Sequence, residues 1–589
     1  MKRANDTLYD VLDRYTGDYT TYEKVTTDTD GTGMTDAKCD GVLYKKLITN
    51  GVTEYFRAAG IPVLDVMQFG ATGSPSGDDS EAFAKVIEWV GRHKNTIEGL
   101  STDAITLSIR CNSPTGVFRI AQPQKMMAQA VAIGGGRRIG LRYFSDNRTA
   151  IKFDAPESAP ANTDEDVILM YNGNQFQYVR FERLKFIGTN AKHVLLYSSA
   201  NGGAQDYMFH DCDFFGTWKN QIKVRGSNGA NNNSEWKFEA CAFSLNCKTL
   251  WDIADSDQFL NFWASKCKFW LSDGEHIRCT KGGHFAFWGC DWSGLTPEKP
   301  VEANTSYLFN LLGNTRARGV CSFTIHHGRF EHKTIYSSLM YCEWNIGNVT
   351  FDNVDCGSQA SLVTGINDTT QVYFNPGTTG GPIVSFNNCS LIGRHQYDRI
   401  SGPNYSAAGS SIAYYKGCNF ELTNNLDSRF VFGGSSTIGT QWIAVVEDSK
   451  STTTKTSSGA YKIYTINANY NAIGMSGANI RPHIVCATGA DKKLPFTNGV
   501  LGIDLPLGAR IRNVVLYIEG NTVTDSYNYN LEDGAGNIIL SLSGTDASVN
   551  NNNEATRFIS VTTANRSFII RDIANQVNAK IGACLITYI

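Results

Sequence analysis

The sequence predicts a right-handed parallel β-helix with a helix before it and a β-sandwich after it. Three observations lead to this fold class. A six-residue segment recurs about every 29 residues, an amphipathic segment precedes the first repeat, and alternating strand patterns replace the repeat near the C-terminus. Repeats of this length that consist of short strands and turns are typical of solenoids.

The recurring segment is FHDCDF at 209–214. It reappears as FEACAF (238–243), FWGCDW (287–292) and YKGCNF (415–420), with looser copies between them. Stacked coils lie about 4.8 Å apart, so equivalent residues should lie above one another. The intervals between fourth positions are 28, 29, 26, 23, 38, 26, 35 and 29 residues, and those positions are Leu184, Cys212, Cys241, Cys267, Cys290, Gly328, Val354, Cys389 and Cys418.

The cysteine at the fourth position could be a metal ligand, half of a disulfide or a small core residue. Leucine, glycine and valine occupy this position in other copies, which a metal site would not tolerate. Apolar residues stand at the first, fourth and sixth positions, and a bend before the fourth lets Cys and Phe both point inward. The 15 cysteines are an odd number without a C-x-x-C pair. We therefore expect a ladder of free thiols, folding in a reducing cytoplasm, and neither a metal nor another cofactor.

An amphipathic helix is predicted at 78–94, before the first repeat. Asp78 or Asp79 can cap its N-terminus. Its apolar face is predicted to consist of Phe83, Val86, Ile87 and Val90. We expect this helix to cover the open edge of the first coil, because an uncovered edge invites the addition of further strands.

The segment FGATGSPSGDDSEAF at 69–83 resembles the entry motif of pectate-lyase-like β-helix proteins, which is commonest in bacteriophage tailspikes. The motif usually reads Phe-Gly-Ala-x-Gly-Asp-Gly-x-x-Asp-Asp-x-x-Ala-Phe/Ile, and GSPSG replaces its Gly-Asp-Gly part here. Residues 39–61 resemble the short segment that precedes the β-helix in phage tail proteins. The resemblance spans about residues 40–435. It implies a homotrimeric tailspike on the virion that binds and cuts bacterial capsular or other surface polysaccharide.

The other parts of the chain fit this plan. Residues 1–62 are polar and suit a segment that attaches the protein to other phage tail or baseplate proteins. The β-helix is expected over 63–435, and the polar stretch at 436–480 suits a connector or a trimerisation region. Alternating apolar residues over 481–589 predict a C-terminal β-sandwich, which could clamp the trimer or bind carbohydrate.

Composition and motifs exclude several other classes of protein. The net charge of -3 provides no basic surface, so nucleic acid is not an expected partner. The N-terminus has no apolar signal region and no run of 18 apolar residues occurs, so we expect neither a signal peptide nor membrane insertion. Without a signal peptide, an extracellular pectinase-like enzyme of a bacterium is disfavoured. P-loop, G-x-S-x-G and H-E-x-x-H motifs are absent from the sequence.

The repeat register predicts one outward column of ionisable residues. Eleven residues after the fourth positions stand Leu195, Lys223, Asp252 and Arg278, and the residues on both sides are apolar. Because those neighbours should face the core, the last three should lie in line on consecutive coils about 5 Å apart. The same face is predicted to carry further residues, two positions away or at the strand edges: His193, Gln221, His276, Tyr197, Arg225, Thr280, Asp255, Asp257 and Glu275.

Two kinds of chemistry fit this face. A hydrolase needs two carboxylates, for which Asp252 with Glu275 or Asp255 would serve. A lyase instead needs a base such as His276 or a lysine, and a cation such as Arg278 that neutralises the carboxylate of a uronate. The residue pattern leaves hydrolase and lyase open.

Substrate binding is predicted for cations on the same face. Lys223, Arg225 and Arg278 suit an acidic glycan, and Asp257 and Tyr197 are the other predicted contacts. The column could instead be a salt-bridged surface ladder or could face a neighbouring subunit. A tail adhesin that binds glycan without cutting it is the alternative function.

The tryptophans fall into two predicted groups. Core positions are expected for Trp251, Trp288 and Trp292. Stacking positions for sugar rings are expected among Trp218, Trp270 and Trp344. If the site lies between subunits, Glu343 or Asp368 could supply carboxylates.

Overall fold

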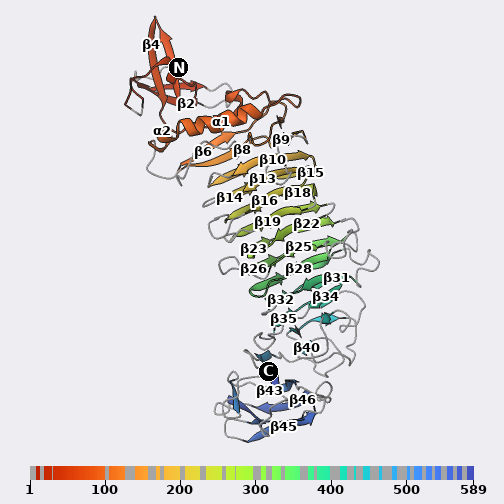
Figure 1. Cartoon of the computed structure of the whole chain (residues 1–589). Coiled ribbons are helices and arrows are strands. Elements are labelled where there is room, and N and C mark those ends of the chain that lie inside the picture. Colours follow the sequence, from red (N-terminus) through yellow and green to blue (C-terminus); the bar gives the residue numbers. More distant parts are fainter. Residues whose placement is uncertain are drawn as a thin grey trace. The chain divides into compact units, whose positions relative to one another are not determined.

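The chain folds into two compact units, Met1–Glu298 and Lys299–Ile589. Strands dominate both units (Figure 1). The computed structural model describes residues 8–12, 19–28, 31–99, 105–126, 139–156, 167–172, 178–198, 206–225, 234–247, 249–254, 261–271, 274–295, 307–313, 321–332, 338–358, 369–376, 381–397, 411–420, 430–432, 442–451, 463–466, 481–486, 500–504, 510–519, 526–532, 537–545, 554–560, 567–572 and 580–588.

An antiparallel sheet with the strand order β1-β2-β4-β3 occupies the N-terminal region. The sheet is not among the predicted elements, because its polar composition conceals it. The β3–β4 hairpin nevertheless has a local signal, since its turn residues Asn50 and Gly51 have φ angles of 52° and 77° and Asn-Gly favours such turns. The elements of this region are β1 (Leu8–Leu12), β2 (Tyr19–Val25), the 3-10 helix η1 (Asp36–Lys38), β3 (Tyr44–Thr49) and β4 (Val52–Ala58).

The predicted amphipathic segment forms the helix α1 (Ser80–Arg92). The predicted apolar face is buried, and it contains Phe83, Val86, Ile87 and Val90. A helix with one apolar stripe is stabilised mainly by packing that stripe against the rest of the protein. The neighbouring elements are β5 (Leu64–Asp65), the 3-10 helix η2 (Val66–Phe69) and α2 (Lys94–Gly99).

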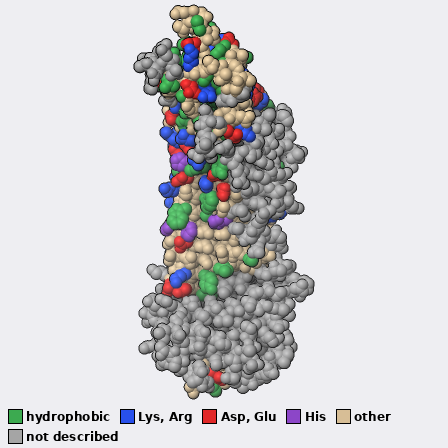
Figure 2. Space-filling view, turned by 90° about the vertical axis from the view of Figure 1, so that its left-hand side faces the viewer, with side chains coloured by type: hydrophobic (Ala, Val, Ile, Leu, Met, Phe, Trp, Pro, Cys, Tyr) green, Lys and Arg blue, Asp and Glu red, His purple; other side chains and the backbone are tan. Residues whose placement is uncertain are grey.

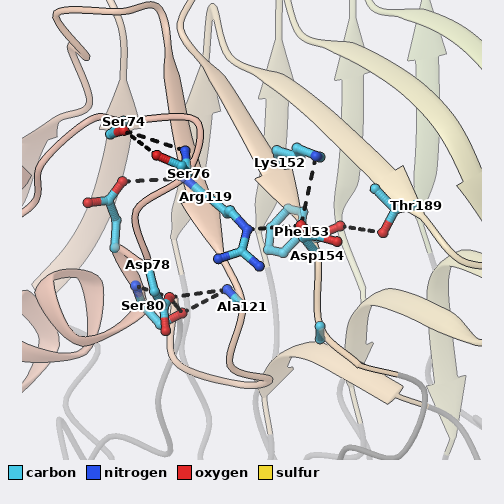
Figure 3. A network of polar contacts seen from close by, with 12 residues as sticks. Ser74, Ser76, Asp78, Ser80, Arg119, Ala121, Lys152, Phe153, Asp154 and Thr189 are labelled. Carbon is cyan, nitrogen blue, oxygen red and sulfur yellow. Dashed lines mark hydrogen bonds and ion pairs between the residues drawn. The ribbon is translucent and has the colours of Figure 1, made fainter.

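Two aspartates join the start of α1 to the strand β7 (Val117–Ile120). Asp78 Oδ1 accepts a hydrogen bond from the backbone N–H of Ala121 at 3.2 Å, and Asp79 Oδ2 accepts one from the N–H of Arg119 at 3.3 Å. Figure 3 shows Asp78 and Ala121 facing each other across this junction. The Asp-Asp pair of the entry motif therefore has a structural role here.

In the first unit the chain passes repeatedly through three parallel sheets, the arrangement of a parallel β-helix (Figure 1). Within this unit, each strand from β8 to β21 pairs with the strand three places later. Sheet 1 contains β5, β6 (Ile105–Arg110), β8 (Ile139–Phe144), β11 (Val179–Glu182), β14 (Tyr207–His210), β17 (Trp236–Glu239), β20 (Phe262–Ser265) and β23 (Gly283–Trp288). Sheet 2 contains β7, β9 (Ala150–Phe153), β12 (Lys185–Thr189), β15 (Asp213–Trp218), β18 (Ala242–Cys247), β21 (Lys268–Leu271) and β24 (Asp291–Leu295). Sheet 3 contains β10 (Val167–Asn172), β13 (His193–Ser198), β16 (Asn220–Arg225), β19 (Thr249–Ala254) and β22 (Glu275–Cys279).

The register between coils follows the predicted repeat at the bend from sheet 1 to sheet 2. Phe181 pairs with Phe209, and Phe209 pairs with Phe238. The residue before each fourth position has a left-handed backbone, with φ between 52° and 63°. In the first unit these residues are Arg183, Asp211, Ala240, Lys266 and Gly289. The chain therefore bends where the sequence predicts, so that the first and fourth positions both face inward.

The fourth-position cysteines form a buried ladder inside the coils. Each is a free thiol and is at most 2% exposed: Cys212, Cys241, Cys267 and Cys290. The Cys241 thiol donates a hydrogen bond to the carbonyl oxygen of Phe209 at 3.3 Å. Beside this ladder the rings of Phe209 and Phe238 stack with centroids 4.9 Å apart. The prediction that these cysteines are core residues is confirmed.

The second unit begins with the same cycle of three parallel strands. One sheet contains β25 (Tyr307–Leu311), β28 (Ser338–Cys342), β31 (Thr370–Phe374), β34 (Arg394–Tyr397) and β37 (Phe430–Phe432). A second contains β26 (Cys321–His326), β29 (Asn348–Asp352), β32 (Ile383–Asn387), β35 (Ser411–Lys416), β38 (Trp442–Glu447) and β40 (Ile463–Ile466). The third contains β27 (Arg329–His332), β30 (Asp355–Ser358), β33 (Ser390–Leu391), β36 (Asn419–Phe420) and β39 (Lys450–Ser451).

Parallel pairing continues past residue 435, the predicted end of the β-helix, because β38 pairs with β35 and β40 with β38. In this coil Ser449 stands after the left-handed residue Asp448, where earlier coils have cysteine. Ser449 is buried, and its hydroxyl donates to the carbonyl oxygen of Tyr415 at 3.3 Å. The serine conceals the repeat from a search for Cys–Phe pairs.

The C-terminal part of the second unit contains two antiparallel sheets of four strands each. Their first strand begins at Arg481, the first residue of the predicted C-terminal region. One sheet contains β41 (Arg481–Cys486), β48 (Lys580–Tyr588), β43 (Arg510–Glu519) and β46 (Glu554–Ser560). The other contains β42 (Val500–Asp504), β47 (Ser567–Asp572), β44 (Ser526–Glu532) and β45 (Ile538–Thr545).

Candidate functional site

Sheet 3 aligns polar side chains on the four adjacent strands β13, β16, β19 and β22. Tyr197 pairs with Lys223, Lys223 with Asp252, and Asp252 with Arg278. The predicted alignment of Lys223, Asp252 and Arg278 is thus confirmed. The predicted first member, Leu195, is instead buried in the core, and Tyr197 takes its place. The cause is a coil of 26 residues between Tyr197 and Lys223, two fewer than the repeat interval predicts.

Two carboxylates near this column each lie beside an arginine. Arg225 on β16 donates to Asp252 on β19, with Nη2 and Oδ2 2.5 Å apart. Arg278 Nη1 lies 3.7 Å from Glu275 Oε1 within β22. The hydroxyl of Thr249 donates to the other oxygen of Glu275 at 3.0 Å. The Glu275 side chain is only 8% exposed and that of Asp252 is 18% exposed, so both are partly shielded from water.

Lys223 and Tyr197 are more enclosed than the sequence predicts. Lys223 is only 4% exposed, although the column was expected to face solvent. Tyr197 is also buried, and it packs with Ile168 and Val194. A long lysine stem can lie along its neighbours, and here Tyr197 and Asp252 flank it on both adjacent strands. Arg278 is therefore the most exposed member of the column.

His276 lies in the core, and the prediction that it faces outward is wrong. Its Nδ1 accepts a hydrogen bond from Trp292 Nε1 at 2.9 Å, and its ring contacts that of Phe269 with centroids 5.2 Å apart. Burial lowers the pKa of His276 to about 3, so the ring is neutral at neutral pH. A side chain in this position cannot reach a substrate on the outer face.

The inward position of His276 has a local cause. The inward–outward alternation of side chains fails at the start of β22, where the chain has just turned out of sheet 2. His276 and Ile277 are consecutive residues there, and both are buried. Gln221 is buried in the same way and accepts a hydrogen bond from Trp251 Nε1 at 2.6 Å. His193, also predicted to face outward, is buried, and its Nε2 lies 3.1 Å from the carbonyl oxygen of Ala155.

Some predicted site residues lie outside the described part of the chain. These are Asp255, predicted as catalytic, and Asp257, predicted as substrate-binding. Most of the insertion at 293–306, which could wall a groove, lies there too. Within the described ranges, no group of three or more His, Cys, Asp and Glu side chains could hold a metal ion. The described helices include none with the length and apolar character needed to cross a membrane.

The tryptophans differ from their predicted positions in three cases. Trp251 and Trp292 are core residues as predicted, but Trp288 is 55% exposed. Trp288 occupies the second position of its repeat, between inward residues, and alternation turns it outward. Trp270 is exposed, and Lys268 Nζ lies over one face of its ring, 4.1 Å from the centre. The other two proposed stacking residues are buried, Trp218 and Trp344.

A carboxylate that sequence reasoning could not place lies in the second unit. Glu343 follows β28 and accepts hydrogen bonds from the hydroxyl of Tyr341 at 3.0 Å and from the backbone N–H of Gly313 at 2.9 Å. Asn375 donates to the same tyrosine hydroxyl at 3.1 Å. Residues two apart on a strand point to the same face, so the sequence could have indicated the contact of Tyr341 with Glu343. Asp368 lies outside the described residues.

Comparisons with known proteins give matches in structure and none in sequence. No family model matches, and no curated protein is significantly similar. The enzymatically active domain of tailspike protein 4 of bacteriophage CBA120 is 13% identical, with 96% of this chain and 72% of that chain covered and a TM-score of 0.30. The tailspike protein of Acinetobacter baumannii phage AM24 is 11% identical, with 99% and 90% covered and a TM-score of 0.37.

A bacterial protein is among the similar structures as well. Pantoea stewartii WceF, described as a glycan biofilm modifying enzyme with a tailspike-like parallel β-helix fold, is 10% identical, with 97% of this chain and 66% of that chain covered and a TM-score of 0.24. The solved structures that this chain resembles are therefore phage tailspikes and a tailspike-like β-helix. The assignment of a parallel β-helix rests on the strand pairing of the chain itself.

Proposed function

We propose that this chain is a phage tailspike subunit that binds and depolymerises bacterial capsular or other surface polysaccharide. The observation that carries the proposal is the pair of carboxylates on sheet 3, Asp252 and Glu275, each beside an arginine. Two carboxylates are what most enzymes that hydrolyse glycosidic bonds require. Successive parallel coils also offer an extended surface along which a polymer can lie.

Hydrolysis is the reaction that these residues favour over elimination. His276, the histidine considered as the base of a lyase, is enclosed in the core. Asp252 is partly exposed, and Glu275 is buried beside the exposed Arg278. In the proposed reaction one of them protonates the leaving oxygen while the other acts as base or nucleophile. Arg225 and Arg278 lie beside them, and guanidinium groups suit the carboxylates of acidic sugars.

The remaining parts of the chain have proposed roles in the virion. The N-terminal sheet within 1–62 would attach the spike to other tail or baseplate proteins, and α1 would cover the first coil against strand addition. Three chains would assemble with C3 symmetry. The region 436–480 would connect or trimerise the spike, and the two C-terminal sheets would pack as a sandwich that clamps the trimer or binds carbohydrate.

Two substitutions test the proposed site. Asp252→Asn and Glu275→Gln each remove one negative charge with little change of shape. Each should slow the shortening of a capsular polysaccharide by at least about hundredfold, because a positioned acid or base contributes that much to the rate. Glu182→Gln is the matched control, since Glu182 also pairs with an arginine of a neighbouring coil, Arg142, at 2.5 Å but on sheet 1.

The readout is the rate at which new reducing ends appear in the polysaccharide. The proposal expects full activity in Glu182→Gln and a loss in both sheet 3 variants. Unchanged rates in Asp252→Asn and Glu275→Gln would place the chemistry elsewhere. Binding of polysaccharide by the wild-type protein without any shortening would favour the alternative function, a non-catalytic glycan-binding adhesin.

A further inference from the structure

The outer face of sheet 1 carries two tryptophans on adjacent strands. Trp263 on β20 pairs with Ala286 on β23, and Ser265 on β20 pairs with Trp288 on β23. The tryptophans thus stand at diagonal corners of a rectangle whose other two corners are small residues. With strands about 4.8 Å apart and about 6.6 Å between alternate residues, their Cα atoms are about 8 Å apart, close enough for both indole rings to contact one ligand.

Both rings reach the surface of the molecule. Trp288 is 55% exposed, and Trp263 is partly exposed. Figure 2 views the side of the molecule on which β14 and β23 lie in Figure 1, and hydrophobic side chains reach the surface there among charged residues and histidines. Exposed aromatic groups within a polar surface commonly mark a binding site.

Polar groups lie around Trp263, one of the two tryptophans. Lys237 Nζ lies 5.5 Å from the centre of the Trp263 ring and 2.9 Å from Asp206 Oδ1. The ring of His284 meets that of Trp263 edge to face with centroids 6.5 Å apart, and its Nδ1 lies 3.2 Å from Asn261 Oδ1. Burial lowers the pKa of His284, so its ring is neutral at neutral pH. Trp263 is therefore bordered by an ammonium and an imidazole, with a carboxylate and an amide bonded to them.

We propose that Trp263 and Trp288 form a second carbohydrate site, which holds a pyranose ring of the surface polysaccharide away from the carboxylates of sheet 3. The apolar C–H face of a pyranose packs on an indole ring, while its hydroxyl groups need donors and acceptors at the edge. Lys237, Asp206 and His284 supply both kinds of group, an arrangement typical of ligand sites. The identity of the ligand rests on the proposed function, since it is the same polymer.

The test compares the double variant Trp263→Ala/Trp288→Ala with the single variants and with Trp270→Ala in the full chain. Trp270 is a matched control because it is 40% exposed and has Lys268 Nζ 4.1 Å from its ring centre, but it belongs to sheet 2. The probe is an array of immobilised bacterial capsular polysaccharides. Affinity is then measured by isothermal titration calorimetry with each polysaccharide that the wild-type protein binds. Light scattering and thermal melting report the oligomeric state and the fold.

The double variant should bind about tenfold or more weakly than wild type, each single variant should lose part of that affinity, and Trp270→Ala should bind normally. Equal binding by the double variant and wild type overturns the inference while leaving the proposed function intact. A changed oligomeric state in the double variant also overturns it, because the pair would then belong to a subunit contact. Tryptophan-dependent binding without cleavage supports the inference and contradicts the proposed enzymatic function. Failure of the wild-type protein to bind any polysaccharide contradicts both.

Discussion

His276 is the single residue whose environment differs most from the predicted one. The indole N–H of Trp292 donates to it, and Phe269 packs against it. Burial lowers its pKa to about 3, whereas a histidine in the unfolded chain titrates near 6.5. Between these values the unfolded chain binds a proton that the folded chain does not, so the free energy of unfolding falls as the pH is lowered through this window.

The variant His276→Gln should remove this pH dependence. Glutamine keeps an acceptor for Trp292 but does not titrate. In wild type, each pH unit between about 6.5 and 3 should cost up to about 1.4 kcal/mol of unfolding free energy from this group. Urea unfolding at several pH values should therefore give a shallower slope for the variant. His210→Gln on β14 is the control and should keep the wild-type slope.

If the unfolding free energy changes with pH equally in His276→Gln and wild type, His276 is not a buried, neutral histidine. A shallower slope in His210→Gln would assign the pH dependence to surface charge instead. The two outcomes are separable because His276 is fully buried and His210 lies on the outer side of sheet 1.

Residue positions could be predicted from the sequence where strands alternate strictly. Lys223, Asp252 and Arg278 lie in the middle of their strands, and counting from the repeat aligned them correctly. The same alternation could have placed Trp288 on the outer face. Phe287 before it points inward, and Gly289 after it forms the bend. His276 could not be placed in this way, since it lies at a strand start where two consecutive residues turn inward.

Among the structural elements, the bend between sheet 1 and sheet 2 repeats most regularly. The left-handed residue keeps its N–H bonded across the bend, as Ala240 donates to the carbonyl oxygen of Ser265 at 2.9 Å. Asparagine, aspartate and glycine tolerate this backbone well, but alanine has neither a helpful side chain nor the freedom of glycine. Ala240, with φ of 53°, is therefore a strained position of this set, as are Arg183 and Lys266.

Ala240→Gly should stabilise the protein. Relief of the left-handed strain outweighs the greater flexibility of glycine in the unfolded chain, and we expect a gain of about 0.5–1 kcal/mol in unfolding free energy. Ala242→Gly, two residues later at the start of β18, is the control and should lose about that amount. Chemical denaturation measures the change in unfolding free energy of both variants. Destabilisation of similar size in both would contradict a strained left-handed backbone at Ala240.

Elements could be predicted wherever the Cys–Phe repeat is visible. The repeat located the strands on either side of the bend, from β11 and β12 to β35 and β36, and counting on from it located β13, β16, β19 and β22. The four apolar residues located α1. The coil that contains Ser449 escaped because serine replaces cysteine at the same buried position. The contact of Asp252 with Arg225 and the burial of Lys223 could not be predicted. Both depend on side-chain packing between coils, which a repeat pattern does not encode.

For the molecule as a whole, the sequence predicted the succession of parts better than their boundaries. A parallel β-helix occurs in both units, and antiparallel strands begin at Arg481. The N-terminal sheet was missed, and the parallel coils extend to Ile466. Polar composition obscured the N-terminal sheet, because short exposed strands need few apolar residues. The last coil was missed because Ser449 stands there in place of cysteine.

The most direct test of the central claim is incubation of the purified wild-type protein with a panel of bacterial capsular polysaccharides. Chain length, new reducing ends and the near-ultraviolet absorbance of an unsaturated uronate would be followed together. The proposed hydrolase predicts that at least one polysaccharide is shortened, with new reducing ends and without that absorbance. Shortening with the absorbance would indicate a lyase and contradict the proposed roles of Asp252 and Glu275. Binding without shortening of any polysaccharide would contradict a depolymerase.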